Sequence, residues 1–81
     1  MQVHVQFFSR LKELVRDAES SYELAPGSTV ADLLAELYAC SPALRDWDKS
    51  ILIGAGVEFV SRDYVLQPGD EIAIMPPVQG G

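Results

Sequence analysis

One stretch of this chain has a clear helical period, and the sequence on both sides of it alternates instead. Thr29 and Asp32 have the spacing of a capping box, in which the two side chains satisfy backbone N–H groups at the start of a helix. Apolar residues then follow the i, i+3, i+4, i+7 rule of an amphipathic helix, at Val30, Leu33, Leu34 and Leu37. The pattern predicts one helix that ends near Cys40, with this apolar face in the core.

Strand patterns flank the predicted helix. They lie at residues 2–8, 20–26, 51–53, 57–60 and 71–75. A glycine-rich hairpin over residues 54–56 is expected to join two of the later strands, and Pro68-Gly69 has the sequence of a type II turn before the last one. Pro76 and Pro77 lack backbone N–H groups, so they prevent the last strand from continuing into a central ladder.

This order of elements limits the fold. The first two strands form a hairpin, the helix crosses one face, and the last strand then lies parallel to the first, because a parallel pair needs such a crossover. The sequence therefore predicts an α+β roll of the β-grasp kind, a mixed sheet with one main helix on one face. We expect a folded domain over residues 1–75 and an extended tail over residues 76–81.

Charge and composition exclude several classes of function. The net charge of −6 argues against nucleic acid as a partner, since phosphates would repel the chain. No stretch approaches the ~20 apolar residues that span a bilayer, so no membrane association is expected. Cys40 is the only cysteine, which rules out an internal disulfide and favours a reducing cytoplasm.

The body of the predicted domain offers no active site. His4 and Cys40 are its only soft metal ligands, and two such groups do not make a zinc site. His4 is expected on the outer sheet face as a surface histidine. Cys40 is expected to be a small buried core residue rather than a catalytic thiolate. The sequence predicts no metal site and no bound cofactor.

The outer sheet face and the end of the chain carry the remaining candidate residues. Alternation places Phe8, Phe59 and Met75 on the face away from the helix, and a contiguous apolar patch there would be an interaction site. The alternative is three scattered exposed hydrophobic residues, which are normal on a protein surface. Parity by itself does not decide between the two.

The sequence ends in PPVQGG, and this ending has a physical interpretation. Two prolines stiffen the exit from the sheet, and six extended residues reach about 20 Å. Gly80 and Gly81 add no bulk, so a terminal carboxylate on Gly81 could thread a narrow channel in another protein. A frayed terminus is the alternative, and the two glycines alone would favour it.

The whole chain resembles the ubiquitin-like sulfur carriers, and among them the small subunits of molybdopterin synthase. The resemblance rests on VQFFSRLKELV near the start, DYVLQPGDEIAIMPPV near the end and the closing QGG. It implies that an adenylating enzyme related to ubiquitin activators uses ATP to form an acyl-adenylate on Gly81, which a sulfur donor converts to a thiocarboxylate. Gly80 would allow an unhindered approach. The sulfur would then pass to cyclic pyranopterin monophosphate to form the molybdopterin dithiolene.

The resemblance also implies partners and contact residues. The expected partners are the large synthase subunit, in a heterotetramer, and the adenylating and sulfurating enzyme. The implied partner-binding residues are Phe8, Phe59, Met75, Pro76, Pro77, Val78 and Gln79. Two features depart from the family: Gly54-Ala55-Gly56, where an asparagine is common, and Gln79, where a small hydroxyl residue is common.

Two alternatives share the predicted fold. One is a thiamine-type sulfur carrier, which would deliver sulfur to a thiazole-forming enzyme. The other is a ubiquitin-like binding or conjugation module whose tail is inert or forms an isopeptide link to a lysine. The proline pair before the tail and the 81-residue length favour the molybdopterin pathway over thiamine, but the sequence does not exclude the conjugation module.

Overall fold

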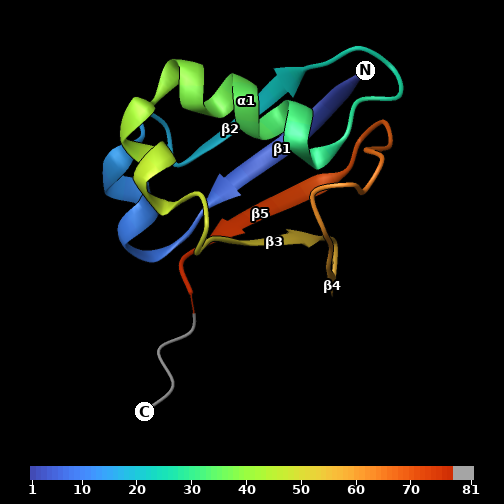
Figure 1. Ribbon diagram of the computed structural model, residues 1–81. Helices are drawn as coiled ribbons and strands as arrows, with labels where there is room; N and C mark the ends of the chain where they lie inside the picture. Colours follow the sequence, from blue (N-terminus) through green and yellow to red (C-terminus); the bar gives the residue numbers. More distant parts are fainter. Residues whose placement is uncertain (78–81) are drawn as a thin grey trace.

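The computed structural model describes residues 1–77 and consists of one sheet covered on one face by a helix (Figure 1). The elements in chain order are β1 (Gln2–Phe7), the 3-10 helix η1 (Ser9–Leu14), β2 (Glu19–Glu23), α1 (Val30–Cys40), the 3-10 helix η2 (Pro42–Trp47), β3 (Leu52–Ala55), β4 (Glu58–Phe59) and β5 (Glu71–Met75). The predicted helix and strands are therefore all present, with shifts of one to three residues at their ends.

The sheet has the order β2-β1-β5-β3-β4. β1 pairs antiparallel with β2 and parallel with β5, with Val5 opposite Ile72 in the parallel pair. β3 runs antiparallel to both β5 and β4. The parallel pairing of the first and last strands confirms the predicted crossover and the α+β roll. In this roll, α1 follows the β1–β2 hairpin and crosses one face of the sheet.

The core lies between α1 and the facing side of the sheet. From the sheet it receives the alternate residues of the two central strands, Val3, Val5, Phe7, Ile72 and Ile74, each at most 1% exposed. From α1 it receives the predicted helix face, Val30, Leu33, Leu34 and Leu37, each at most 2% exposed. Burying a side chain of this size stabilises the fold by roughly 1.5–3 kcal/mol, so these two facing rows hold the helix on the sheet.

The backbone N–H groups at the start of α1 find hydrogen-bond acceptors in two places. Thr29 and Asp32 form the predicted capping box, in which the Thr29 backbone N–H donates to Asp32 Oδ2 at 2.9 Å. The next two N–H groups, of Val30 and Ala31, donate to the carbonyls of Tyr64 and Arg62, both at 3.0 Å. The loop before β5 therefore covers the helix start, which fixes α1 over the sheet.

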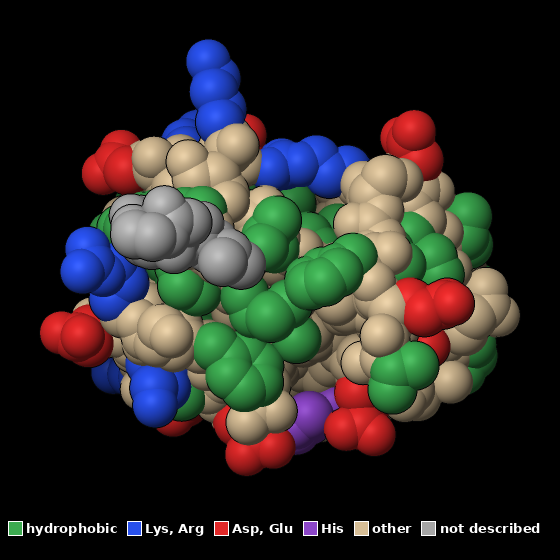
Figure 2. Space-filling view, turned by 90° about the horizontal axis from the view of Figure 1, so that it is seen from below, with side chains coloured by type: hydrophobic (Ala, Val, Ile, Leu, Met, Phe, Trp, Pro, Cys, Tyr) green, Lys and Arg blue, Asp and Glu red, His purple; other side chains and the backbone are tan. Residues whose placement is uncertain are grey.

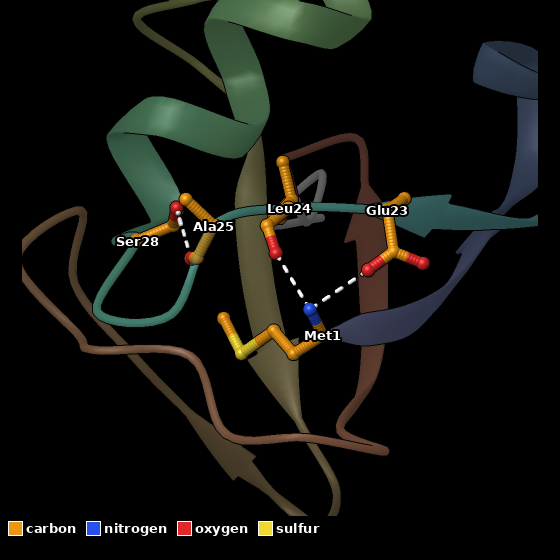
Figure 3. A network of polar contacts seen from close by, with 5 residues as sticks. All are labelled: Met1, Glu23, Leu24, Ala25 and Ser28. Carbon is orange, nitrogen blue, oxygen red and sulfur yellow. Dashed lines mark hydrogen bonds and ion pairs between the residues drawn. The ribbon is translucent and has the colours of Figure 1, made fainter.

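A polar network ties the beginning of β1 to the end of β2 (Figure 3). The Met1 ammonium donates to Glu23 Oε2 at 2.8 Å and to the Leu24 carbonyl at 2.7 Å. In the turn that follows, the Ser28 hydroxyl donates to the Ala25 carbonyl at 2.7 Å. The first two bonds join the start of β1 to the end of β2, and the third stabilises the turn that leads toward α1.

Two expectations are corrected. The hairpin between β3 and β4 turns at Gly56-Val57 rather than over residues 54–56, because Gly54 and Ala55 stay paired with Phe59 and Glu58. Gly56 has a φ of 64°, which glycine adopts without strain. Cys40 is exposed rather than buried, since it is the last residue of α1 and the backbone leaves the helix at Ser41.

Candidate functional site

The candidate site is the outer face of the sheet, on the side opposite α1. Figure 2 views the molecule from below and shows apolar side chains gathered at the centre of its surface. Phe8, which follows β1, is 38% exposed, and Phe59 of β4 is 70% exposed. Met75, the last residue of β5, is partly buried beside them. The structure thus places all three predicted side chains on one surface.

Strand pairing brings these residues together. The Phe8 N–H donates to the Ile74 carbonyl at 3.0 Å, which fixes Phe8 beside the end of β5. Across the sheet, Gly54 lies opposite Ala73 on one side and opposite Phe59 on the other. A single hollow joins them, lined by Phe8, Gly54, Gly56, Val57, Glu58, Phe59, Ala73 and Met75. The apolar patch, defined by Phe8, Phe59 and Met75, is therefore contiguous and concave.

The sequence interpretation missed part of this hollow. Val57 was expected in a strand, but it lies in the turn and its side chain is fully exposed. Gly54 and Ala73 were not assigned to the patch, because neither carries a large side chain. An apolar, β-branched residue directly after a hairpin glycine was the available signal, since turns usually hold polar residues.

A groove beside the patch is lined in part by Pro76 and Pro77, the root of the tail. Pro76 and Pro77 leave β5 and line this groove together with Ser9, Arg10 and Trp47 from the two 3-10 helices. The Arg10 guanidinium lies 5.8 Å from the centre of the Trp47 ring, within the range of a cation–π contact. The remaining predicted site residues, Val78, Gln79, Gly80 and Gly81, lie outside the described residues.

Asp48, the residue after Trp47, connects three elements of the fold. Asp48 accepts hydrogen bonds from the Tyr38 hydroxyl of α1 and from Arg62, whose Nη1 lies 2.7 Å from Asp48 Oδ1. The Arg62 hydrogen bond lowers the pKa of Asp48. Burial, followed by the hydrogen bond to Asp48, raises the pKa of Tyr38 to about 12. This clamp, formed by Tyr38, Asp48 and Arg62, joins α1, η2 and the loop before β5.

The positive charges of the chain are unevenly distributed. Five of the six Lys and Arg residues lie in η1, in η2 or within two residues of their ends, at Arg10, Lys12, Arg16, Arg45 and Lys49. In Figure 2, Lys and Arg side chains lie above and to the left of the apolar side chains at the centre. Within residues 1–77, Arg62 is the only Lys or Arg in an ion pair. The other five side chains are exposed and unpaired in this part of the chain, on a molecule whose net charge is −6.

Other candidate chemistry is sparse in the described part of the chain. His4 Nε2 lies 2.7 Å from Glu19 Oε2 on the neighbouring strand, where it forms a cross-strand pair. Residues 1–77 contain no group of three His, Cys, Asp or Glu side chains arranged to hold a metal ion. Among the same residues, no helix has the length and apolar character that crossing a membrane requires.

Comparison with known proteins gives matches over nearly the whole chain. The model of the ThiS family matches residues 5–81. The molybdopterin synthase sulfur carrier subunit of Chlamydomonas reinhardtii is 36% identical over 83 aligned residues, which cover all of both chains.

Two solved structures have the same fold. SAMP1, the small archaeal modifier protein 1 of Haloferax volcanii, aligns over the full length of both chains with a TM-score of 0.85 and 27% identity. A chain in the complex of subunits 1 and 2 of the molybdopterin-converting factor from Helicobacter pylori aligns over the full length of both with a TM-score of 0.74. At 24% identity this second likeness concerns the fold alone.

Proposed function

This chain belongs to the ThiS family, and we propose that it is the sulfur carrier subunit of a molybdopterin synthase. The full-length similarity to a relative with that name supports the assignment. The structural observation that carries it is the hollow apolar patch directly beside the root of the tail, at the end of β5. A partner seated on this patch would be in position to receive the residues that follow Pro77.

The reacting group in this proposal is the carboxylate of Gly81. A free carboxylate is a poor electrophile, so an ATP-using enzyme first attaches AMP and releases pyrophosphate. A sulfur donor then displaces AMP and leaves a thiocarboxylate, which is a sulfur nucleophile that can attack the pterin substrate. Covalent carriage divides one difficult step into easier ones. Gly80 leaves the carbonyl carbon open to attack, and this chain supplies no cofactor of its own.

The proposed partner of the apolar patch is the large subunit of molybdopterin synthase. In support, the structure from Helicobacter pylori is a complex of two subunits of the molybdopterin-converting factor, and one of them shares this fold. Phe8, Phe59 and Met75 would bury their exposed surface in the contact. Pro76 and Pro77, followed by Val78 and Gln79, would line the path of the tail, and the folded domain of residues 1–75 would position it. We place this assembly in the cytoplasm, without nucleic acid or membrane.

A second candidate is a protein modifier, and one observation favours it. SAMP1 has a very similar fold and is named a modifier protein. In that case Gly81 would form an isopeptide bond with a lysine of another protein instead of carrying sulfur. The two functions leave different products, because a modifier gives conjugates of higher mass whereas a carrier returns to its original mass after each cycle.

Reconstitution of the synthase tests the proposal. Thiocarboxylated carrier, purified large subunit and cyclic pyranopterin monophosphate should give molybdopterin. Deleting Gly81, or adding one residue after it, should abolish activity, because the reacting atoms must approach within about 3–3.5 Å. Cys40→Ser should remain active, since Cys40 is exposed on α1 and takes no part in the proposed reaction. An active deletion variant, or a folded Cys40→Ser variant without activity, would contradict the assignment.

A further inference from the structure

We propose that Gly54 determines which partner side chain the apolar patch accepts, by keeping open the hollow between Phe8, Phe59 and Met75. The inference rests on the proposed function, because the occupant is taken to be an apolar side chain of the large synthase subunit. It goes further by assigning a specificity-determining role to a residue that contributes no side chain of its own.

The backbone at Gly54 does not require glycine. Gly54 lies inside β3, paired on both sides, and its φ is outside the left-handed region that favours glycine. Gly56 and Gly69 differ in this respect, with φ values of 64° and 81°. Glycine inside a strand is less stable than alanine, because it loses more conformational freedom on folding. The reason for a glycine at position 54 must therefore lie in the space above it.

That space belongs to the hollow. A Cβ atom at position 54 would lie 3.4 Å from the Met75 methyl carbon, 3.6 Å from Ala73 Cβ and 3.7 Å from the Glu58 carbonyl oxygen. These are ordinary contacts, so the fold has room for alanine. A larger side chain would displace the Met75 methyl group or rise between Phe8 and Phe59. Gly54 and Ala73 thus form a low floor, and the three larger residues form the walls.

The lining indicates what enters the hollow. Apart from Glu58 it carries no charged residue, so an aliphatic or aromatic side chain fits it best. Met75 is unbranched and flexible, and can adjust to the shape of an inserted group. Met75 also immediately precedes the two prolines of the tail root, so a partner that holds the tail lies next to this hollow. These observations point to the subunit that accepts the tail as the source of the inserted side chain.

A substitution series with a matched control tests the inference. Gly54→Ala should raise the thermal midpoint by about 3 °C, because alanine is more stable in a strand. The same change should weaken binding to the purified large subunit, and Gly54→Val should weaken it by about tenfold or more, as expected for overpacking. The control is Gly69→Ala in the turn before β5. Its positive φ should lower the midpoint, while the affinity stays within about twofold of wild type.

The outcomes separate the inference from the proposed function. Affinities of Gly54→Ala and Gly54→Val equal to wild type would overturn the inference and leave the proposed function intact. A midpoint for Gly54→Ala as low as that of Gly69→Ala would also overturn it, since Gly54 would then be a structural glycine. A wild-type chain that neither binds the large subunit nor accepts sulfur would contradict the proposed function itself, and the inference with it.

Discussion

Phe8 is the residue at which binding and folding are easiest to separate. Its side chain is 38% exposed beside Met75, whereas its neighbour Phe7 is buried in the core. Phe8→Ala should weaken the complex with the large subunit by ~2 kcal/mol or more, about 30-fold, because a central aromatic residue is lost. The thermal midpoint should change little. Titration calorimetry and thermal unfolding measure the two effects, and an unfolded variant would show that Phe8 belongs to the core.

At the residue scale, strand parity predicted the large outward side chains but not the shape of the surface they form. Alternation along a strand places Phe8 and Met75 outward whatever their neighbours are. The hollow between them depends on which residues face each other across strands, and Gly54 lies opposite Ala73 only once the register is known. Cys40 was expected in the core because free cysteines are usually buried, but it lies exposed as the last residue of α1.

The clamp of Tyr38, Asp48 and Arg62 makes a prediction at the scale of elements. It links α1, η2 and the loop before β5, so its loss should loosen the groove beside Trp47. The pKa of Tyr38 is raised from 10.0 to about 12 in the folded state. Its contribution to stability is therefore complete below the unfolded pKa of 10.0, and is lost as the pH rises through about 12.

Tyr38→Phe isolates this contribution. The variant should be less stable than wild type by roughly 1.5 kcal/mol near neutral pH, since it loses a hydrogen bond to a carboxylate. That difference should shrink between about pH 10 and pH 12, where the wild-type hydroxyl ionises. Urea unfolding of both proteins at about pH 8 and pH 11.5 measures it. A difference that is equal at the two pH values would contradict the role given to the clamp.

The elements themselves were predictable where local chemistry and burial agree. The capping box and the helical period both indicate α1, and the alternation indicates β1. Both elements are present. The turn between β3 and β4 was misplaced because positions 54 and 56 are both glycine, and the sequence alone does not tell which of them lies in the turn. Only Gly56 needs a positive φ, and only the pairing of Gly54 with Phe59 shows which glycine belongs to the turn.

The charge distribution of the whole molecule predicts how it meets its partners. On a chain with a net charge of −6, five cations unpaired in the described residues gather around η1 and η2, next to the tail root. A partner with acidic groups there would be steered toward the tail, and salt would screen that attraction. The association rate with the large subunit should therefore fall as ionic strength rises from about 0.05 M to 0.5 M.

Arg10→Gln should reduce this salt dependence and slow association at low salt. Gln67→Glu is the matched control, because it lowers the net charge equally but lies in the turn at the other end of β5. Stopped-flow measurements of both variants locate the effect. If the control slowed association as much as Arg10→Gln, net charge rather than the cationic end would be responsible.

Topology is the feature of the whole molecule that the sequence specified best. One helix, with two strands before it and three after it, has few ways to bury its apolar face, and the parallel pairing of β1 with β5 follows from the crossover. The groove lined by Pro76, Pro77 and Trp47 was not predictable in the same way. It depends on the contact between η1 and η2, which are far apart in the sequence and have no strong pattern of their own.

The intact mass of the carrier tests the central claim most directly. The wild-type protein, treated with its activating enzyme, ATP and a sulfur donor, should gain the mass difference between one sulfur and one oxygen atom. Fragmentation should place that gain on Gly81, and the large subunit with its pterin substrate should restore the original mass. A gain located on Cys40, or conjugates to lysine in place of the sulfur form, would contradict the account.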